Sequence, residues 1–406
     1  MKVFLISIGN ELLTGKTINT NASWLGKKLT ILGCTVENQI TIPDSDTAIS
    51  NSIDYFMNTD CSCVIITGGL GPTVDDITRK ALFDYFGTSY YFDEEYWNIL
   101  EDRFKKRDLK IPVSNRNQAL VPDNGYVIHN PVGTARGLKF KKNDKFIFSL
   151  PGVPIEMKSM FESEIKPWVS NQVEPFFTST IRTTGIQESV IIEKIDMVLK
   201  KENDYTIGYY PSIDGVDIKI TGKIENNIEK LCNNITSKLG DNVYCTDERS
   251  IEEVVVDKAI KNKITISLAE SCTGGLIGHR ITEVSGSSKI FKGGMIVYSN
   301  NAKINNLGIS RECIKENGAV SEETALEMSK NIRSIFSTDI GISVTGIAGP
   351  TGNTAKKPVG LIFVGLSTKD FNRTRKFQFH SNRSNNKRKT SQVVLEWLRM
   401  ELNDVK

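Results

Sequence analysis

Histidine is scarce in this sequence, and its cysteines include no pair with the CxxC spacing. The 406 residues include three histidines and seven cysteines, with no CxxC spacing. These counts and spacings do not indicate a cysteine-based zinc site or a disulfide framework, and three isolated histidines do not favour a Ser-His-Asp triad. We therefore expect reduced thiols, and we expect any proton transfer to use groups other than histidine.

Long apolar runs and an excess of one charge are also absent. The apolar start of the chain is interrupted at Gly9, Asn10 and Glu11, and no run reaches the length of about 18 residues that a membrane span needs. Lysine and arginine number 51 against 48 aspartate and glutamate, a net charge of +3. We therefore expect a cytoplasmic protein without a membrane segment, and the charge gives no indication of nucleic acid binding.

The order of apolar and polar segments predicts three domains. Residues 1–170 alternate strand-like runs such as VFLISIG and CVIITGG with helical stretches, which indicates an α/β module. A small α+β domain is expected over residues 171–247, and a second α/β module over residues 248–406. The predicted fold class is α/β, with two separate α/β modules joined by the small α+β domain.

A glycine-rich turn follows the strand CVII, in the segment ITGGLGPTVDDIT. Gly68, Gly69 and Gly71 have no side chains, so their backbone amides can approach a phosphate closely, and Thr73 follows near a helix start. Ligands of open parallel sheets bind at the carboxyl ends of the strands. We therefore interpret this turn as part of a nucleotide site.

Four acids lie near the turns of the first module, namely Glu11, Asp44, Asp75 and Asp76. Carboxylates that converge in this way could hold a divalent cation against a pyrophosphate, because hard cations prefer oxygen ligands. Each acid could also cap a helix or lie in a solvated loop. The residues alone leave both interpretations open.

Five motifs occur in order along the first module: GNELLTGKTINTN, GGLGPTVDDIT, SNRNQALVP, NPVGTARG and LPGVPIEM. With them, residues 1–165 resemble the molybdopterin-binding fold at the start of CinA-family proteins. The resemblance implies a metal-dependent ADP-ribose pyrophosphatase in which the four acids handle the metal and the pyrophosphate, and it places Asn117 at the nucleotide site. Molybdenum-cofactor enzymes share the fold and the glycine motif, so a pterin ligand is the alternative.

A second glycine turn, SLAESCTGGLIG, follows a strand and opens a helix in the last module. Ser271, Thr273, Gly274 and Gly275 are expected at a helix N-terminus that attracts a ligand phosphate or carboxylate. The alternative is a helix cap made by the hydroxyls, with glycines that allow tight packing.

Polar side chains are dense in the span VSGSSKIFKGGMIVYSNNAK, which contains Ser288, Tyr298, Asn300 and Lys303. A serine becomes a useful nucleophile only beside a base, and in a histidine-poor chain Lys303 or Tyr298 could accept its proton. A polar turn with an ordinary surface lysine is the alternative.

Two later segments extend the predicted site. VTGIAGPTG repeats the strand-to-glycine-turn pattern, with Thr345 as a hydroxyl donor and backbone amides near Gly346 that could stabilise an oxyanion. In HSNRSNNKRKT, Arg383 and Arg388 could bind a phosphate through two hydrogen bonds each, or they could be solvated surface charges.

The segments AESCTGG, SGSSKIFKGGMIVYSNNAK, GAVSEET, VTGIAGP and KPVGLIFVG together resemble the CinA C-terminal domain, which also exists alone as nicotinamide-nucleotide amidase. The resemblance implies hydrolysis of the carboxamide of nicotinamide mononucleotide (NMN) to nicotinic acid mononucleotide and ammonia, without a metal. By position, Ser288 resembles the catalytic serine, Tyr298 and Lys303 its polar partners, and Thr345 a catalytic residue that contacts the substrate or the transition state.

The implied partners are therefore small nucleotides, NMN and ADP-ribose, with a divalent metal ion in the first module and a homodimer as the assembly. The alternative function is a nucleotide- or pterin-binding sensor or adaptor linked to competence, which carries out no chemistry.

Overall fold

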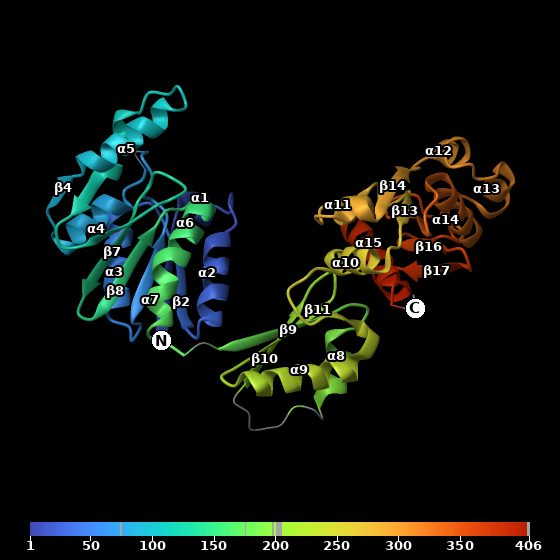
Figure 1. The fold of residues 1–406 in the computed structure, drawn as a ribbon, viewed down its shortest axis with the longest axis horizontal. Helices are drawn as coiled ribbons and strands as arrows, with labels where there is room; N and C mark the ends of the chain where they lie inside the picture. The colour runs from blue at the N-terminus through green and yellow to red at the C-terminus, as the bar shows by residue number, and fades with distance from the viewer. Residues whose placement is uncertain (74, 175, 197–198, 200–204, 404–406) are drawn as a thin grey trace. The chain divides into compact units, whose positions relative to one another are not determined.

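The computed structural model describes residues 1–73, 75–174, 176–196, 199 and 205–403. The chain forms two compact units, Met1–Phe177 and Thr178–Lys406, and each is considered by itself (Figure 1). In the described residues, no helix has the length and apolar character needed to cross a membrane.

The N-terminal unit is built on a six-stranded sheet with the order β2-β1-β3-β8-β7-β6. Its strands are β1 (Lys2–Ile8), β2 (Thr35–Ile42), β3 (Cys63–Thr67), β6 (Tyr126–Ile128), β7 (Gly137–Lys142) and β8 (Lys145–Leu150). β1 is parallel to β2 and β3, and β3 is parallel to β8, whereas β7 is antiparallel to both of its neighbours. The carboxyl ends of β1, β2, β3 and β8 therefore share one edge of the sheet.

Helices cover both faces of this sheet (Figure 1). One face packs against α2 (Thr20–Ile31), α6 (Pro154–Met160), the π-helical turn Phe161–Ile165 and α7 (Lys166–Ser170); the other packs against α3 (Asp46–Met57) and α4 (Thr78–Phe86). Alternate residues of β1 enter the two cores, Val3 and Leu5 on one side and Phe4 and Ile6 on the other. Burial on both faces explains why the strand is apolar throughout.

Further elements complete this unit. They are α1 (Asn10–Leu13), β4 (Tyr90–Phe92), α5 (Glu94–Lys105), the 3-10 segment Val113–Ala119 and β5 (Leu120–Pro122), with β4 antiparallel to β5.

The second unit begins with a small α+β domain. Its four-stranded sheet has the order β10-β11-β9-β12, with β9 (Phe177–Thr183), β10 (Tyr205–Pro211), β11 (Val216–Gly222) and β12 (Val243–Cys245). The helices α8 (Glu188–Ile195) and α9 (Glu225–Leu239) accompany the sheet. The alternating burial of β11, with Val216, Ile218 and Ile220 inside, shows that one face of the sheet carries this core.

The rest of the second unit is an α/β domain with a five-stranded sheet of order β14-β13-β15-β16-β17. The strands are β13 (Ile266–Glu270), β14 (Phe291–Ile296), β15 (Ile340–Gly346), β16 (Leu361–Ser367) and β17 (Asn372–Gln378). β13 is parallel to β14 and β15, while β16 is antiparallel to β15 and β17. The predicted fold class, two α/β modules with a small α+β domain between them, is confirmed.

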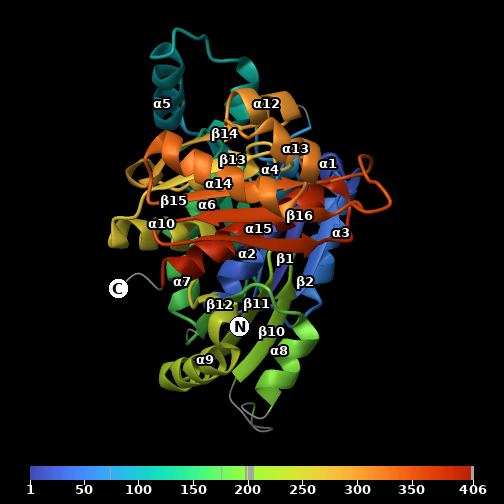
Figure 2. The same cartoon turned by 90° about the vertical axis from the view of Figure 1, so that its right-hand side faces the viewer.

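Helices lie on both faces of this sheet as well. α10 (Ile251–Asn262), α11 (Leu276–Thr282) and α15 (Arg383–Glu401) share one core with Leu268, and α14 (Glu322–Phe336) shares another with Ala269. Figure 2 shows α14 lying along β15 and β16. The short helices α12 (Asn300–Asn305) and α13 (Arg311–Asn317) connect β14 to α14.

Candidate functional site

Three turns meet at the carboxyl edge of the C-terminal sheet. Parallel pairing sets Glu270, the last residue of β13, opposite Ile296 of β14 and Val344 of β15. The backbone continues this pairing past the strand ends, because Val297 N donates to Glu270 O at 2.8 Å and Ser271 N donates to Val344 O at 3.0 Å. Side chains that follow the three strands are thereby brought to one place.

Lys303 and Ser271 are in direct contact at this edge. The Lys303 ammonium donates to Ser271 Oγ at 2.8 Å and to the carbonyl of Val297 at 3.0 Å. Both side chains are buried, with exposed fractions of 2% for Lys303 and 6% for Ser271. Burial lowers the pKa of the Lys303 amine, and no ion pair to it is found among the described residues. The pair thus has the composition of a nucleophile and its base.

Ser288, the serine predicted to be catalytic, lies at the other end of the sheet. It belongs to the 3-10 segment Ser287–Lys289, which precedes β14, and its side chain is exposed. β14 has six residues, which correspond to about 20 Å of extended chain, between Ser288 and the turn that carries Tyr298. The structure therefore corrects the prediction: within one chain, Lys303 pairs with Ser271 and not with Ser288.

The thiol next to Ser271 is not prepared for attack. Complete burial raises the pKa of the Cys272 thiol to about 12, which keeps it protonated at neutral pH. Ser271 is therefore the nucleophile candidate of this turn.

Glu270 occupies the helix N-terminus that the sequence suggested as an anion site. Its carboxylate accepts hydrogen bonds from the amides of Gly275, Ile277 and Gly278 at 2.8 to 3.2 Å. The first turn of α11 is thus already capped by a buried carboxylate, so the expectation that it binds a ligand anion is corrected. The sequence signal for this cap was an acid at the end of the strand that leads into the glycine turn.

The other residues of the turn have defined tasks. Gly274 and Gly275 adopt the left-handed φ values of 62° and 93° that glycine tolerates. Thr273 is fully buried, and among the described residues no atom pairs with its hydroxyl. A buried donor without a partner is costly, so this hydroxyl is a candidate ligand contact.

Arg383 is placed beside the site, whereas Arg388 is not available. Arg383 donates to the Tyr298 hydroxyl at 2.7 Å and to the Gly349 carbonyl at 2.8 Å. Arg388 forms a two-point ion pair with Asp214 of the small domain. The prediction that Arg388 binds a phosphate is therefore corrected. Lys387, which the sequence analysis missed, has its ammonium 3.6 Å from the position of a Cβ on Gly274.

Three further residues that were predicted to contact the substrate are Thr345, Gly346 and Asn300. The Thr345 hydroxyl is fully buried and donates to the Ala319 carbonyl at 2.6 Å, which corrects its predicted role as a donor to substrate. Gly346 packs so closely against β16 that a Cβ would lie 2.4 Å from Ile362 Cδ1. Asn300 is exposed in the first turn of α12.

In the N-terminal unit, the glycine turn is packed against its neighbours. A Cβ on Gly68 would lie 2.3 Å from the Ile8 carbonyl, and one on Gly69 would lie 2.1 Å from Thr78 Oγ1. Asn117 donates to the Gly71 carbonyl at 3.2 Å, and among the described residues its side-chain oxygen has no partner. Gly68 and Gly69 are therefore required for close packing, and Asn117 stabilises the turn through its hydrogen bond to the Gly71 carbonyl.

The four acids of this unit do not form a metal site in the structure. Asp44 accepts the amide of Asn10 at 2.9 Å, and Asp76 accepts both the amide and the hydroxyl of Thr73. Glu11 and Asp75 are exposed. Among the described residues, no three His, Cys, Asp or Glu side chains lie close enough together to hold a metal ion. Asp44 thus accepts an amide of the first turn of α1, Asp76 holds the loop before α4, and the predicted convergence is corrected.

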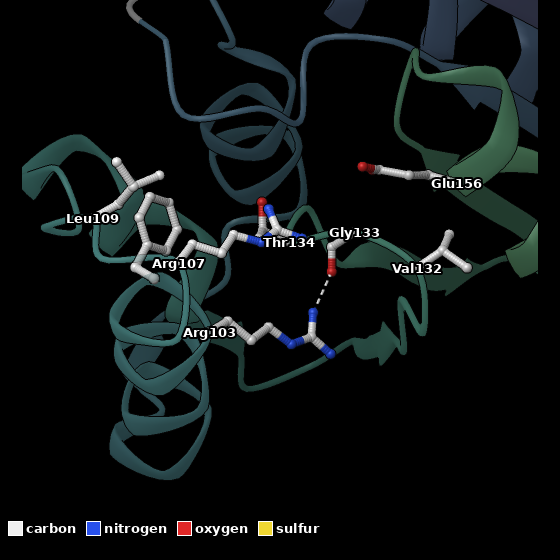
Figure 3. A pocket seen from close by; sticks show the side chains of 8 residues that line it. Arg103, Arg107, Leu109, Val132, Gly133, Thr134 and Glu156 are labelled. Carbon is white, nitrogen blue, oxygen red and sulfur yellow. Dashed lines mark hydrogen bonds between the residues drawn. The ribbon is translucent and has the colours of Figure 1, made fainter.

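A pocket of about 310 Å³ lies elsewhere in this unit (Figure 3). Arg103 and Arg107, on and just after α5, lie on one side of it, and Glu156 of α6 lies on the other. Arg103 donates to the Gly133 carbonyl at 2.7 Å, and burial raises the pKa of the Glu156 carboxyl. The sequence motifs covered Gly133 and Glu156 but assigned them no role, and no motif marked the arginines.

Comparison with known proteins follows this domain order. Family models match residues 4–171 (Probable molybdopterin binding domain), 178–245 (Damage-inducible protein CinA KH domain) and 248–402 (CinA C-terminal domain). A CinA-like protein of Kosmotoga olearia is 38% identical over 99% of both chains, and a competence-damage inducible protein of Caldicellulosiruptor bescii is 39% identical over 98% of this chain and 99% of its own. This chain belongs to the CinA family.

A solved structure, competence/damage inducible protein CihA from Agrobacterium tumefaciens, is 33% identical over 38% of this chain and 98% of its own, with a TM-score of 0.36. The KH domain model matches residues 178–245, and this segment contains no pair of glycines with the GXXG spacing. KH domains clamp an RNA backbone with a GXXG loop. The middle domain thus lacks the sequence feature by which KH domains hold nucleic acid.

The cap formed by Glu270 predicts a local loss of stability in Glu270→Ala. Three amides at the start of α11 lose their acceptor, so we expect the free energy of opening of this helix to fall by about 1–3 kcal/mol. Hydrogen exchange of peptides from residues 271–285 measures this free energy of opening. Glu283→Ala removes an exposed carboxylate from the end of the same helix and should change the free energy of opening by less than about 0.5 kcal/mol. Equal effects of the two variants would contradict the cap.

Proposed function

We propose that the C-terminal domain hydrolyses the carboxamide of NMN to nicotinic acid mononucleotide and ammonia, with Ser271 as nucleophile and Lys303 as base. The observation that carries the proposal is the 2.8 Å hydrogen bond between these two buried side chains. The resemblance of the sequence to nicotinamide-nucleotide amidase supplies the substrate, and the geometry supplies the choice of serine.

The depressed pKa of Lys303 is what makes the pair usable. A lysine at its ordinary pKa would be protonated at neutral pH and could not act as a base. Burial without a carboxylate partner in the described residues disfavours the charged form, so a larger fraction of the amine is neutral. Its contact with Val297 O fixes the direction of the amine toward Ser271.

The reaction then runs as an acyl transfer in two halves. Neutral Lys303 accepts the hydroxyl proton while Ser271 Oγ attacks the carboxamide carbon. The C–N bond of the tetrahedral intermediate breaks, and Lys303 returns the proton to the leaving ammonia. Water next attacks the ester, giving a proton to Lys303, which passes it to Ser271 Oγ. One amide and one water become one carboxylic acid and one ammonia.

Substrate contacts are available on both sides of the pair. The unpartnered Thr273 hydroxyl, two residues from the nucleophile, can donate to the carboxamide oxygen as negative charge develops. Arg383 and Lys387, on one face of α15 at a spacing of four, can hold the phosphate of NMN.

We also propose that the N-terminal unit binds a nucleotide with a pyrophosphate, such as ADP-ribose, at the pocket of Figure 3. The two arginines supply positive charge for the phosphates, and Glu156 can accept a ribose hydroxyl. Cleavage of the pyrophosphate is the reaction that the sequence resemblance implies. Because the acids do not gather around one point, binding is the step for which this geometry gives support.

The choice between the two serines predicts opposite outcomes. Ser271→Ala should lower kcat/KM for ammonia release from NMN by at least about 1,000-fold, because the nucleophile is lost. Ser288→Ala removes an exposed hydroxyl at the far end of β14 and should stay within about 2-fold of the unmodified chain. A large loss of kcat/KM in Ser288→Ala with little loss in Ser271→Ala would exclude Ser271 as the nucleophile. Absence of ammonia release from the unmodified chain would favour a binding protein without chemistry.

The role of Lys303 predicts a pH profile. Since the neutral amine is the base, kcat/KM should fall as pH drops below the pKa of Lys303, and the midpoint should lie below the ordinary lysine value of 10.5. Lys303→Arg keeps a cation that cannot be deprotonated, so it should be inactive at every pH. A flat profile for the unmodified chain, or an active arginine variant, would exclude this base.

The N-terminal pocket predicts a charge effect on binding. Arg107→Gln should weaken the affinity for ADP-ribose, measured by calorimetry without added metal, by about 5-fold. Lys105→Gln removes an exposed cation from the last turn of α5 outside the pocket and is the matched control. An equal loss in both variants would indicate only general electrostatic attraction.

A further inference from the structure

The hairpin between β10 and β11 of the middle domain reaches the C-terminal domain. Its turn residues Ile213 and Asp214 line a pocket of about 460 Å³ together with Leu276 of α11 and with Lys387 and Arg388 of α15. The pocket is therefore shared by two domains of the same compact unit.

Specific contacts fix the hairpin in this place. The Asp214 carboxylate accepts hydrogen bonds from Nε of Arg388 at 2.8 Å and from a terminal nitrogen of the same guanidinium. Ser212 N donates to the Gly215 carbonyl at 2.8 Å, which closes the turn. Nearer the carboxyl end of α15, Gln392 donates to the Thr184 hydroxyl at 3.2 Å. The two domains are thus joined along one face of α15.

The shared pocket adjoins the place assigned to the substrate phosphate. Lys387 lines the pocket, and its ammonium also lies beside the Gly274 turn that follows the nucleophile. Arg383 is one helical turn earlier on α15. A nucleotide whose phosphate meets Arg383 and Lys387 therefore has the shared pocket, and the hairpin, beyond that phosphate.

We propose that the hairpin tip is a specificity element of the amidase site, which selects mononucleotides against dinucleotides. A dinucleotide such as NAD continues past its first phosphate with a second phosphate and a nucleoside. That second phosphate meets the Asp214 carboxylate, which repels it, and the Arg388 guanidinium beside this carboxylate is already neutralised by it. The inference rests on the proposed amidase function.

The test compares two variants that break the same ion pair in opposite ways. Asp214→Ala removes the repelling charge and frees Arg388, so the inhibition constant of NAD against NMN hydrolysis should fall by about 10-fold. Arg388→Gln also breaks the pair but leaves the carboxylate, so this inhibition constant should not fall. The full chain is used for all measurements.

A matched control is Asp217→Asn in the same domain. Asp217 forms an ion pair with Arg182 at 3.1 Å and does not line the pocket. If Asp214→Ala leaves the inhibition constant of NAD unchanged, or if all three variants lower it alike, the proposal is overturned.

The two proposals can fail separately. If the unmodified chain releases no ammonia from NMN, the amidase function fails. The selection by the hairpin is then tested by calorimetry, which measures the dissociation constants of NMN and NAD. Asp214→Ala should lower the ratio of the NAD constant to the NMN constant by the same factor of about 10. An unchanged ratio would overturn the specificity role itself.

Discussion

The candidate amidase site depends on the parallel register of β13 with β14 and β15. Because the three strands run in one direction, the residues that follow them emerge at the same edge of the sheet. The contact between Ser271 and Lys303 joins positions 32 residues apart along the chain, and a slip of β14 by one residue would turn the side chains of that strand to the opposite faces of the sheet. Capping of α11 by Glu270 then fixes the turn that carries the serine.

The fold and the place of the turns could be predicted from the sequence, whereas the pairing of side chains could not. Glycine turns after apolar runs identify strand ends, and this sufficed to locate Ser271, Lys303 and Thr345 in one region. The distinction between Ser271 and Ser288 depends on which end of β14 each one faces. In the sequence, Ser288 is nearer to Lys303 than Ser271 is, and only the direction of the strand shows that Ser271 is the one in contact.

Charged residues were the hardest to interpret, because the sequence does not show which groups they contact in the folded chain. Arg388 looked like a phosphate ligand because its partner, Asp214, is 174 residues away in another domain. The four acids of the N-terminal module looked convergent because each follows a strand of one sheet, yet Asp44 and Asp76 satisfy nearby amides. A carboxylate near a turn has many backbone donors within reach, and the sequence does not show which of them it takes.

The isolation of Lys303 from carboxylates in the described part of the chain has one more consequence for the proposed chemistry. When the amine takes up the serine proton, it becomes a buried cation whose nearest opposite charge is the oxyanion forming on the substrate. Proton transfer therefore creates the counter-ion of the intermediate at the moment the intermediate appears. A carboxylate beside Lys303 would stabilise its ammonium form before the substrate reacts. Lys303 could then neither accept the serine proton nor supply a new positive charge beside the oxyanion.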